Sequence, residues 1–144
     1  MPIRRFRDTD LPAVVRMSAQ LGYPIADEEA AEFIETIGNH PDHILLVAED
    51  DHHQPLGWAH VFIARRIFAA PFADLGGLVV DEAVRGAQIG TQLVQAAEAW
   101  AVDQGCQRMI VRSNVTREQA HRFYLRLGYK ILKRQAVFEK LLKP

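Results

Sequence analysis

Hydrophobic residues along this chain follow two spacings, one typical of helices and one typical of strands. In four stretches apolar residues recur three and four positions apart, a period that predicts amphipathic helices. These helices are expected over residues 11–21, 27–37, 89–104 and 116–127. Short apolar runs bounded by polar turns predict strands in the remaining chain. The strands are expected over residues 3–6, 44–48, 56–67, 72–80, 108–112, 129–132 and 136–141.

The predicted elements follow the order β-α-α-β-β-β-α-β-α-β-β, which places the chain in the mixed α/β class. Short turns join the second strand to the fourth, so these strands should be antiparallel. The helix over 89–104 should connect two parallel strands. The expected result is a central mixed sheet of seven strands with helices on both faces. No repeat, low-complexity tract or Pro-, Gly- or Ser-rich linker interrupts the chain, so residues 1–144 are expected to form a single domain.

Composition narrows the classes of function. Of the 144 residues 49% are hydrophobic and 24% are charged, and the formal net charge of -1 offers no basic field to nucleic acid. No apolar run approaches the roughly 20 residues that span a bilayer, so no membrane partner is expected. The first residues lack the apolar segment of a secretory signal. The single cysteine, Cys106, allows no internal disulfide, which favours a cytoplasmic protein. It precedes an apolar strand, where a small core residue is expected and a nucleophile is the alternative.

One strand–loop–helix segment carries the first candidate chemistry. Residues Val79–Val94 read VVDEAVRGAQIGTQLV, with Arg85, Gly86 and Gly90 between strand and helix. A helix N-terminus presents unpaired N–H groups and partial positive charge, and nearby glycines let an anion approach the backbone. Neither the dinucleotide fingerprint nor the Walker sequence is present. The segment therefore predicts a phosphate-bearing ligand of another kind, with a turn that binds nothing as the alternative.

Two motifs together resemble the GNAT superfamily of N-acyltransferases. The family's acyl-CoA motif is written [QR]-x-x-G-x-[GA]; here Arg85 and Gly90 fill its ends, and Gln88 replaces its middle glycine. The second motif lies in SNVTREQAHRFYLRLGY, where Tyr124 is followed by Leu127-Gly128-Tyr129. The order of elements and the closing RQAVFEKLL are also similar to the family. The resemblance covers essentially the whole chain.

The resemblance implies an acetyl-CoA-dependent N-acetyltransferase. Such an enzyme moves an acetyl group to a primary amine of a small molecule or peptide by direct attack in a ternary complex. The implied contacts to acetyl-CoA are of two kinds, a strand end for the pantetheine arm and the loop for the pyrophosphate. They comprise Leu78, Val79 and Val80, then Arg85, Gly86, Ala87, Gln88, Ile89, Gly90 and Thr91. Gly76 and Gly77 would permit a bulge or bend in that strand, and tight packing without a bulge is the alternative. If Gln88 must adopt a positive φ, it carries a strain cost of about 1 kcal/mol or more.

The same resemblance assigns roles in proton transfer. Tyr124 matches the family's general acid, which protonates the leaving thiolate. Asp74 resembles the position of the base in one branch of the family, and a strand carboxylate that only attracts cations or pairs with an arginine is the alternative. His60 on the preceding strand is a second candidate base. Arg117 stands where many members have an asparagine, and it either reaches a phosphate of the cofactor or faces solvent.

Other expectations stay open. The resemblance implies that the acceptor lies opposite the cofactor, between the first helical region and the last hairpin. That region includes Leu21, Tyr23, Pro24, Ile25, Asp27, Phe68, Phe72, Arg134 and Gln135. No metal is expected, because the two adjacent histidines of Glu49–Gln54 suit a solvated turn better than one ion. A homodimer is possible. The rival functions are a non-catalytic acyl-CoA-binding regulatory domain of the same fold and a nucleotide-binding protein.

Overall fold

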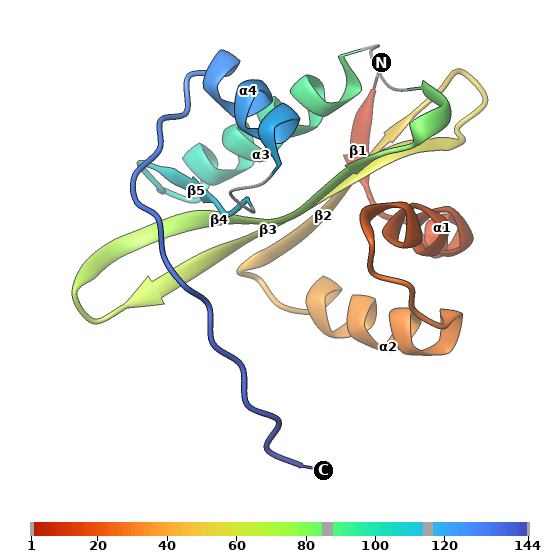
Figure 1. Ribbon diagram of the computed structural model, residues 1–144. Helices are drawn as coiled ribbons and strands as arrows, with labels where there is room; N and C mark the ends of the chain where they lie inside the picture. Colours follow the sequence, from red (N-terminus) through yellow and green to blue (C-terminus); the bar gives the residue numbers. More distant parts are fainter. Residues whose placement is uncertain (1, 85–87, 114–116, 144) are drawn as a thin grey trace. The chain divides into compact units, whose positions relative to one another are not determined.

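A computed structural model of the protein describes residues 2–84, 88–113 and 117–143 (Figure 1). The chain divides into two compact units, Met1–Arg112 and Ser113–Pro144. The first unit contains the sheet and three α-helices, and the second contains one α-helix. Each unit is described by itself below.

The sheet of the first unit has five strands in the order β1-β2-β3-β4-β5. Neighbouring strands are antiparallel from β1 to β4, and β4 pairs with β5 in parallel. The mixed α/β class and the predicted directions are therefore confirmed. The strands are β1 (Ile3–Arg5), β2 (His43–Glu49), β3 (Pro55–Arg66), β4 (Ala69–Val80) and β5 (Met109–Val111).

Two α-helices lie on one face of the sheet and a third lies on the other (Figure 1). Helix α1 (Leu11–Leu21) packs on β3 and β4, and α2 (Asp27–Gly38) packs on β2. Helix α3 (Ile89–Asp103) covers the opposite face, over β2, β3 and β4. Two 3-10 turns, η1 (Asp8–Asp10) and η2 (Glu82–Val84), precede α1 and α3. The predicted helices are thus present within a few residues of their expected ends.

The core lies between the sheet and these helices. Val47 and Val61 in the sheet, Met17 in α1, and Leu93 and Val94 in α3 are inaccessible to solvent. Burial of such side chains contributes about 1.5–3 kcal/mol each. This interlayer packing fixes β4 and the start of α3, which carry the candidate site.

Helices α1 and α3 are both ended by a glycine. Gly22 and Gly105 adopt φ of 103° and 86°, a left-handed conformation that glycine reaches without strain. After α3, the amide of Cys106 donates to the carbonyl of Ala101 at 2.9 Å, and the amide of Gly105 donates to the carbonyl of Val102 at 2.9 Å. This pair of bonds is a Schellman motif. It turns Cys106 inward, where it is 7% exposed, in agreement with the expected core position.

The prediction of seven strands was wrong in its count. Residues 129–143 form neither helix nor strand, so the strands expected over 129–132 and 136–141 are not formed. Val137 and Phe138 are 87% and 92% exposed. An apolar run shows that a segment is able to pair, but a strand forms only when a partner edge satisfies its backbone.

Candidate active site

Strand β4 has an edge that lacks a β5 partner along part of its length. Ala73–Leu75 pairs with Met109–Val111, and β4 then continues to Val80 with pairing described only to β3. On the β3 side His60 is opposite Gly77 and Val61 is opposite Leu75, so Gly76 has no partner. This irregularity is the β-bulge that the two glycines predicted. From Gly76 onward no strand among the described residues of the first unit pairs with the outer edge of β4, so an extended ligand could pair there.

The two glycines let β4 lie against aromatic rings of β3. A Cβ at Gly76 would come within 3.2 Å of His60 Nδ1 and of Phe62 Cε1. A Cβ at Gly77 would come within 2.8 Å of the Trp58 ring. A side chain at Gly77 would clash with the Trp58 ring, and one at Gly76 would force its neighbours to shift by a few tenths of an ångström. The bulge thus places the backbone of β4 close beside the His60 imidazole.

Helix α3 begins without a side-chain cap. The first hydrogen bond within the helix runs from the amide of Gln92 to the carbonyl of Gln88, at 3.1 Å. The amides of Ile89, Gly90 and Thr91 belong to the first turn, whose N–H groups have no acceptor within a helix. These groups and the helix dipole favour an anion. The other predicted phosphate contacts, Arg85, Gly86 and Ala87, lie outside the described residues.

Gln88 adopts φ 61° and ψ 20°, the left-handed conformation, at the N-cap of α3. A non-glycine residue in this region costs about 1–2 kcal/mol. Backbone strain was expected at Gln88 if its φ had to be positive. The positive φ is observed, so this strain is present. The buried side chain of Ile89, which is 2% exposed, holds the adjoining turn against the core.

The loop before α3 is tied to α1 by a small polar network. Arg16 Nη1 donates to Asp81 Oδ2 at 2.8 Å, and the amide of Glu82 donates to Gln20 Oε1 at 3.0 Å. The hydrogen bond from Arg16 and that from the amide of Ala83 hold the pKa of Asp81 below its usual range. Asp81 thus positions the turn that leads to the anion site. Sequence reasoning noted this acid but assigned it no role, because its partners come from a helix about 65 residues away.

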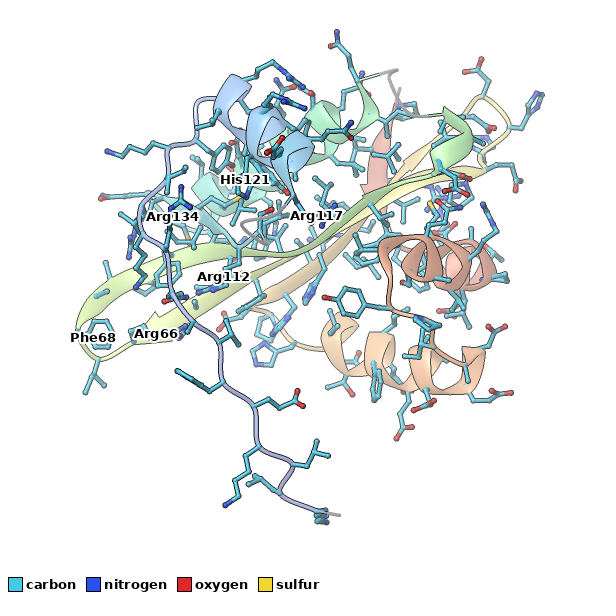
Figure 2. All side chains as sticks on the ribbon, viewed as in Figure 1. Arg66, Phe68, Arg112, Arg117, His121 and Arg134 are labelled. Atoms are coloured by element: carbon cyan, nitrogen blue, oxygen red, sulfur yellow. The ribbon has the colours of Figure 1, made fainter. Side chains whose placement is uncertain are left out.

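Asp74, the proposed base, is 3% exposed in the middle of β4. Its Oδ2 forms an ion pair with Arg112 Nη1, which follows β5 and is labelled in Figure 2. Asp74 pairs with Ile110 across the parallel ladder, which accounts for the approach of Arg112 two residues later. Among the residues that the structure describes, no hydrogen bond engages Asp74 Oδ1. One oxygen is thus held by Arg112, and the described residues offer no hydrogen bond to the other.

His60 lies beside Asp74 on the same side of the sheet. Its Nε2 is 2.9 Å from His43 Nδ1, and the two rings stack with centroids 5.2 Å apart. Burial and the neighbouring His43 lower the pKa of His60 to about 4, and the charge of Asp74 opposes this shift. His60 is therefore uncharged at neutral pH. The contact with His43 was not foreseen, because 17 residues separate the two histidines in the sequence.

In the second unit, helix α4 (Glu118–Arg126) carries Tyr124. The Tyr124 ring is half-buried and meets the rings of Phe123 and Tyr129 edge to face, with centroids 5.1 and 5.8 Å apart. Burial raises the pKa of the Tyr124 phenol, and the charge of Arg117 opposes this. The phenol is therefore protonated at neutral pH, as a proton donor must be. Arg117 is the exposed N-cap residue of α4.

The residues expected near the acceptor have different environments. Tyr23 is 70% exposed, and Phe68 is 84% exposed in the β3–β4 hairpin, where Figure 2 labels it beside Arg66. Phe72 is instead buried beneath the guanidinium groups of Arg66 and Arg108, at 5.6 and 4.7 Å from its ring centroid. Its assignment to the acceptor surface was wrong, because these cation–π contacts cover the ring. The expected C-terminal hairpin around Arg134 is not formed.

The turn after β2 is closed by its own hydrogen bonds. His53 Nδ1 is 3.1 Å from Glu49 Oε1, and Asp50 Oδ1 accepts the amide hydrogens of His52 and Gln54. Within the described ranges, no group of three or more His, Cys, Asp or Glu side chains is placed to hold a metal ion. In the same ranges, no helix combines the length and apolarity needed to cross a bilayer.

A family model described as "Acetyltransferase (GNAT) family" matches residues 11–129. The chain belongs to this family. An aminoglycoside N(6')-acetyltransferase type 1 of Stenotrophomonas maltophilia is 25% identical over 146 residues, covering 99% of this chain and 94% of the relative. An aminoalkylphosphonate N-acetyltransferase of Salmonella typhimurium is 47% identical over 57 residues. That match covers 40% of this chain and only 37% of the relative's length.

Several solved structures share the fold. An aminoglycoside 6'-N-acetyltransferase from Acinetobacter haemolyticus superimposes with a TM-score of 0.85 at 19% identity, covering 99% of this chain and 100% of that one. A transcriptional regulator from Bacillus halodurans C-125 gives a TM-score of 0.87 at 23% identity, with coverage of 96% and 99%. The family match and these likenesses confirm the predicted GNAT fold, and they agree with the prediction of an acetyl-CoA-dependent N-acyltransferase.

Proposed function

We propose that the protein transfers the acetyl group of acetyl-CoA to a primary amine of a small molecule, by direct attack within a ternary complex. The observation that supports the proposal is the edge of β4 from Gly76 to Val80, for which the described strands of the first unit offer no second partner. This stretch precedes η2 and the start of α3, which has no side-chain cap. A thioester with a pantetheine arm and a pyrophosphate needs both an extended hydrogen-bonding edge and an anion site. Members of the same family supply both from these elements.

On the donor side, backbone groups do the binding. Leu78, Val79 and Val80 would pair with the pantetheine arm, and an amide of this stretch would donate to the thioester carbonyl oxygen. Such a donor stabilises the developing oxyanion by about 3–4 kcal/mol in other acyl transfers. The amides from Gln88 to Thr91 would hold the pyrophosphate. Arg85 belongs to the same proposal as a charged partner for phosphate.

Two side chains would move protons. Tyr124 would protonate the sulfur as the C–S bond breaks, since a buried phenol keeps its proton at neutral pH and a free thiol has a pKa near 8.5. Asp74 would receive a proton from the amine through Oδ1, directly or through water, while Arg112 holds Oδ2 in place. Arg117, at the exposed start of α4, is proposed as a phosphate contact.

The acceptor is proposed to be a cationic small molecule. A buried carboxylate attracts an ammonium group, and the relatives' names specify aminoglycosides and aminoalkylphosphonates, which both carry primary amines. A peptide amine is the alternative acceptor. We place the reaction in the cytoplasm, because a single cysteine that forms no internal disulfide suits a reducing compartment.

A non-catalytic acyl-CoA-binding regulator is the second candidate. Gln88 favours this regulator, because a strained glutamine in place of the motif glycine would weaken binding of the pyrophosphate. The two candidates share the binding step and differ in turnover.

Calorimetric titration with acetyl-CoA, with ATP and NAD as controls, tests the binding step. We expect saturable binding of acetyl-CoA alone. Gly90→Glu, which adds a negative charge at the first turn of α3, should abolish it. Gln95→Glu, which adds the same charge at an exposed position further along the helix, should not. Binding followed by CoA release with neamine or 2-aminoethylphosphonate supports the enzyme. Binding without release from any amine of a broad panel supports the regulator, and no binding overturns both.

A further inference from the structure

The two nitrogens of the His60 imidazole have different neighbours. Its Nε2 contacts His43 Nδ1 at 2.9 Å, toward strand β2. Its Nδ1 borders the bulge of β4, where a Cβ at Gly76 would lie 3.2 Å away. The ring therefore lies beside the bulge of β4 at one nitrogen and beside His43 of β2 at the other.

His43 continues this row away from β4. Its ring lies between those of His60 and Phe62, at centroid distances of 5.2 and 5.3 Å and interplanar angles of 15° and 17°. It meets His40 edge to face at 5.0 Å. His43 also lines an open cavity of about 280 Å³ together with Arg5, His40, Trp100 and Gln104. The row of imidazoles thus begins at the candidate site and ends at solvent.

The proposed reaction produces a proton that must leave. An ammonium and a thioester give an amide, a thiol and one proton. The nitrogen loses two hydrogens; one reaches the departing sulfur, and the other has no place in either product. If that proton remained on the buried Asp74, the carboxylate could not serve the next turnover.

We propose that His60 and His43 form a relay that carries this proton from the bulge of β4 to the cavity lined by His43. The inference rests on the proposed function, since it needs an amine that loses a proton. His60 Nδ1 receives the proton, while the hydrogen on His60 Nε2 passes to His43 Nδ1. His43 then releases its Nε2 hydrogen to water in the cavity. After the products leave, water in the emptied site takes the Nδ1 hydrogen of His60. One hydrogen then enters from the cavity at His43 Nε2 and the His43 Nδ1 hydrogen returns to His60 Nε2, which restores the starting tautomers.

The charges around His60 and His43 favour passing a proton on over holding it. Burial lowers the pKa of both imidazoles, and each is lowered further by a neighbouring histidine: His43 for His60, and His40 for His43. The opposing charges are Asp74 beside His60 and Asp42 near His43. Both rings are therefore neutral at rest, so each has a free nitrogen for an incoming proton.

Nitrogen NMR of the histidine side chains tests the resting state without any acceptor. We expect His60 at pH 7 to be neutral, with hydrogen on Nε2 and a bare Nδ1. We expect His43 to be neutral with hydrogen on Nε2. A charged His60, or hydrogen on its Nδ1, would remove the proton-accepting nitrogen from the site and overturn the relay, whether or not the protein proves to be an enzyme.

Kinetics with neamine test the transit. His60→Gln and His43→Phe should each lower kcat by about 10²-fold or more at pH 7, while the affinity for acetyl-CoA is unchanged. The loss should shrink as the pH rises above the pKa of the amine, because a neutral amine yields no net proton. His52→Gln, at an exposed turn position, should match the wild type. A loss of equal size at every pH would indicate only structural roles and overturn the relay. Absence of wild-type turnover on every amine tested would instead count against the proposed enzyme and, with it, the relay.

Discussion

The amide of Tyr129 donates to the carbonyl of Tyr124 at 3.0 Å, and the two rings meet edge to face with centroids 5.8 Å apart. Between them the amide of Gly128 donates to the carbonyl of Leu125 at 3.1 Å. These bonds form a Schellman motif, and the ring contact is the apolar contact that commonly accompanies it. The Leu-Gly-Tyr sequence after α4 thus has a physical task, because it fixes the turn of helix that carries the proposed acid.

Replacement of Gly128 should weaken this helix end through the backbone alone. Gly128 has φ 94° and no atom within 4 Å of an added Cβ, so Gly128→Ala brings strain without a clash. We expect a loss of about 1–2 kcal/mol in the free energy of unfolding, measured by urea titration. Gly38→Ala is the matched control, since its surroundings are equally open and its φ is not positive. It should cost nothing, and an equal loss at both positions would contradict the account.

Tyr124→Phe separates proton donation from packing. The substitution keeps the ring contacts and removes the hydroxyl, so kcat should fall by between about 10²- and 10⁴-fold while acetyl-CoA affinity is retained. Steady-state kinetics and calorimetry measure the two quantities. Turnover at the wild-type rate would show that another group protonates the thiolate.

Substitutions at Gln88 should follow the tolerance of each residue for the left-handed region. Asparagine and glycine enter this region most readily, and β-branched residues enter it least. We expect Gln88→Asn to be at least as stable as the wild type and Gln88→Val to lose more than about 1 kcal/mol. Urea unfolding gives the order. A valine variant as stable as the wild type would mean that the position is unstrained.

The fold was predictable where a local signal and its partner are both encoded in a short stretch. Apolar runs bounded by turn residues located β2, β3 and β4, and the Gly76-Gly77 pair marked where a bulge could form. The segment over 129–143 shows the limit of such signals, because its apolar runs specify no partner edge. The contacts His43–His60 and Asp74–Arg112 could not be predicted from the sequence for a related reason. They depend on the register between strands, which cannot be read from a short stretch of sequence.

The glycines of the bulge should differ in what their replacement disturbs. Gly77→Ala places a Cβ 2.8 Å from the Trp58 ring, and such overpacking costs about 1–3 kcal/mol. Gly76→Ala places a Cβ 3.2 Å from His60 Nδ1 and the Phe62 ring, which must shift by a few tenths of an ångström. We therefore expect Gly77→Ala to lower stability more and Gly76→Ala to lower kcat more. Unfolding and kinetic measurements on both variants decide the order.

A polar cluster at the start of the chain should make stability depend on pH. Arg4 hydrogen-bonds to Asp10 at 2.7 and 2.9 Å and forms an ion pair with Glu49. Burial raises the pKa of Asp10, but the bonds from Arg4 and the amide of Arg7 outweigh it, and the bond from Arg4 also lowers the pKa of Glu49. Their stabilisation is therefore present above the unfolded pKa values near 4 and is lost as the pH falls through the folded values.

Arg4→Met should remove this dependence. At neutral pH the variant leaves two buried carboxylates without their cation, so its Tm should fall by several degrees. The difference from the wild type should narrow as the pH falls below about 4, because the stabilisation is lost between the unfolded pKa values and the lowered folded values of Asp10 and Glu49. Arg5→Met, at the exposed neighbouring position, is the control. Thermal unfolding between pH 3 and pH 7 records the effect, and a difference that does not change with pH would contradict it.

The burial of Cys106 has a practical consequence at the bench. It holds the chain's one thiol, and at 7% exposure this thiol is poorly reachable by reagents in solution. Each acetyl transfer frees one molecule of CoA, whose sulfur reacts readily with a disulfide dye. A colorimetric assay can therefore record turnover continuously in the presence of native enzyme, with a blank of at most one equivalent per chain. The same dye reports unfolding, since Cys106 reacts once the end of α3 opens.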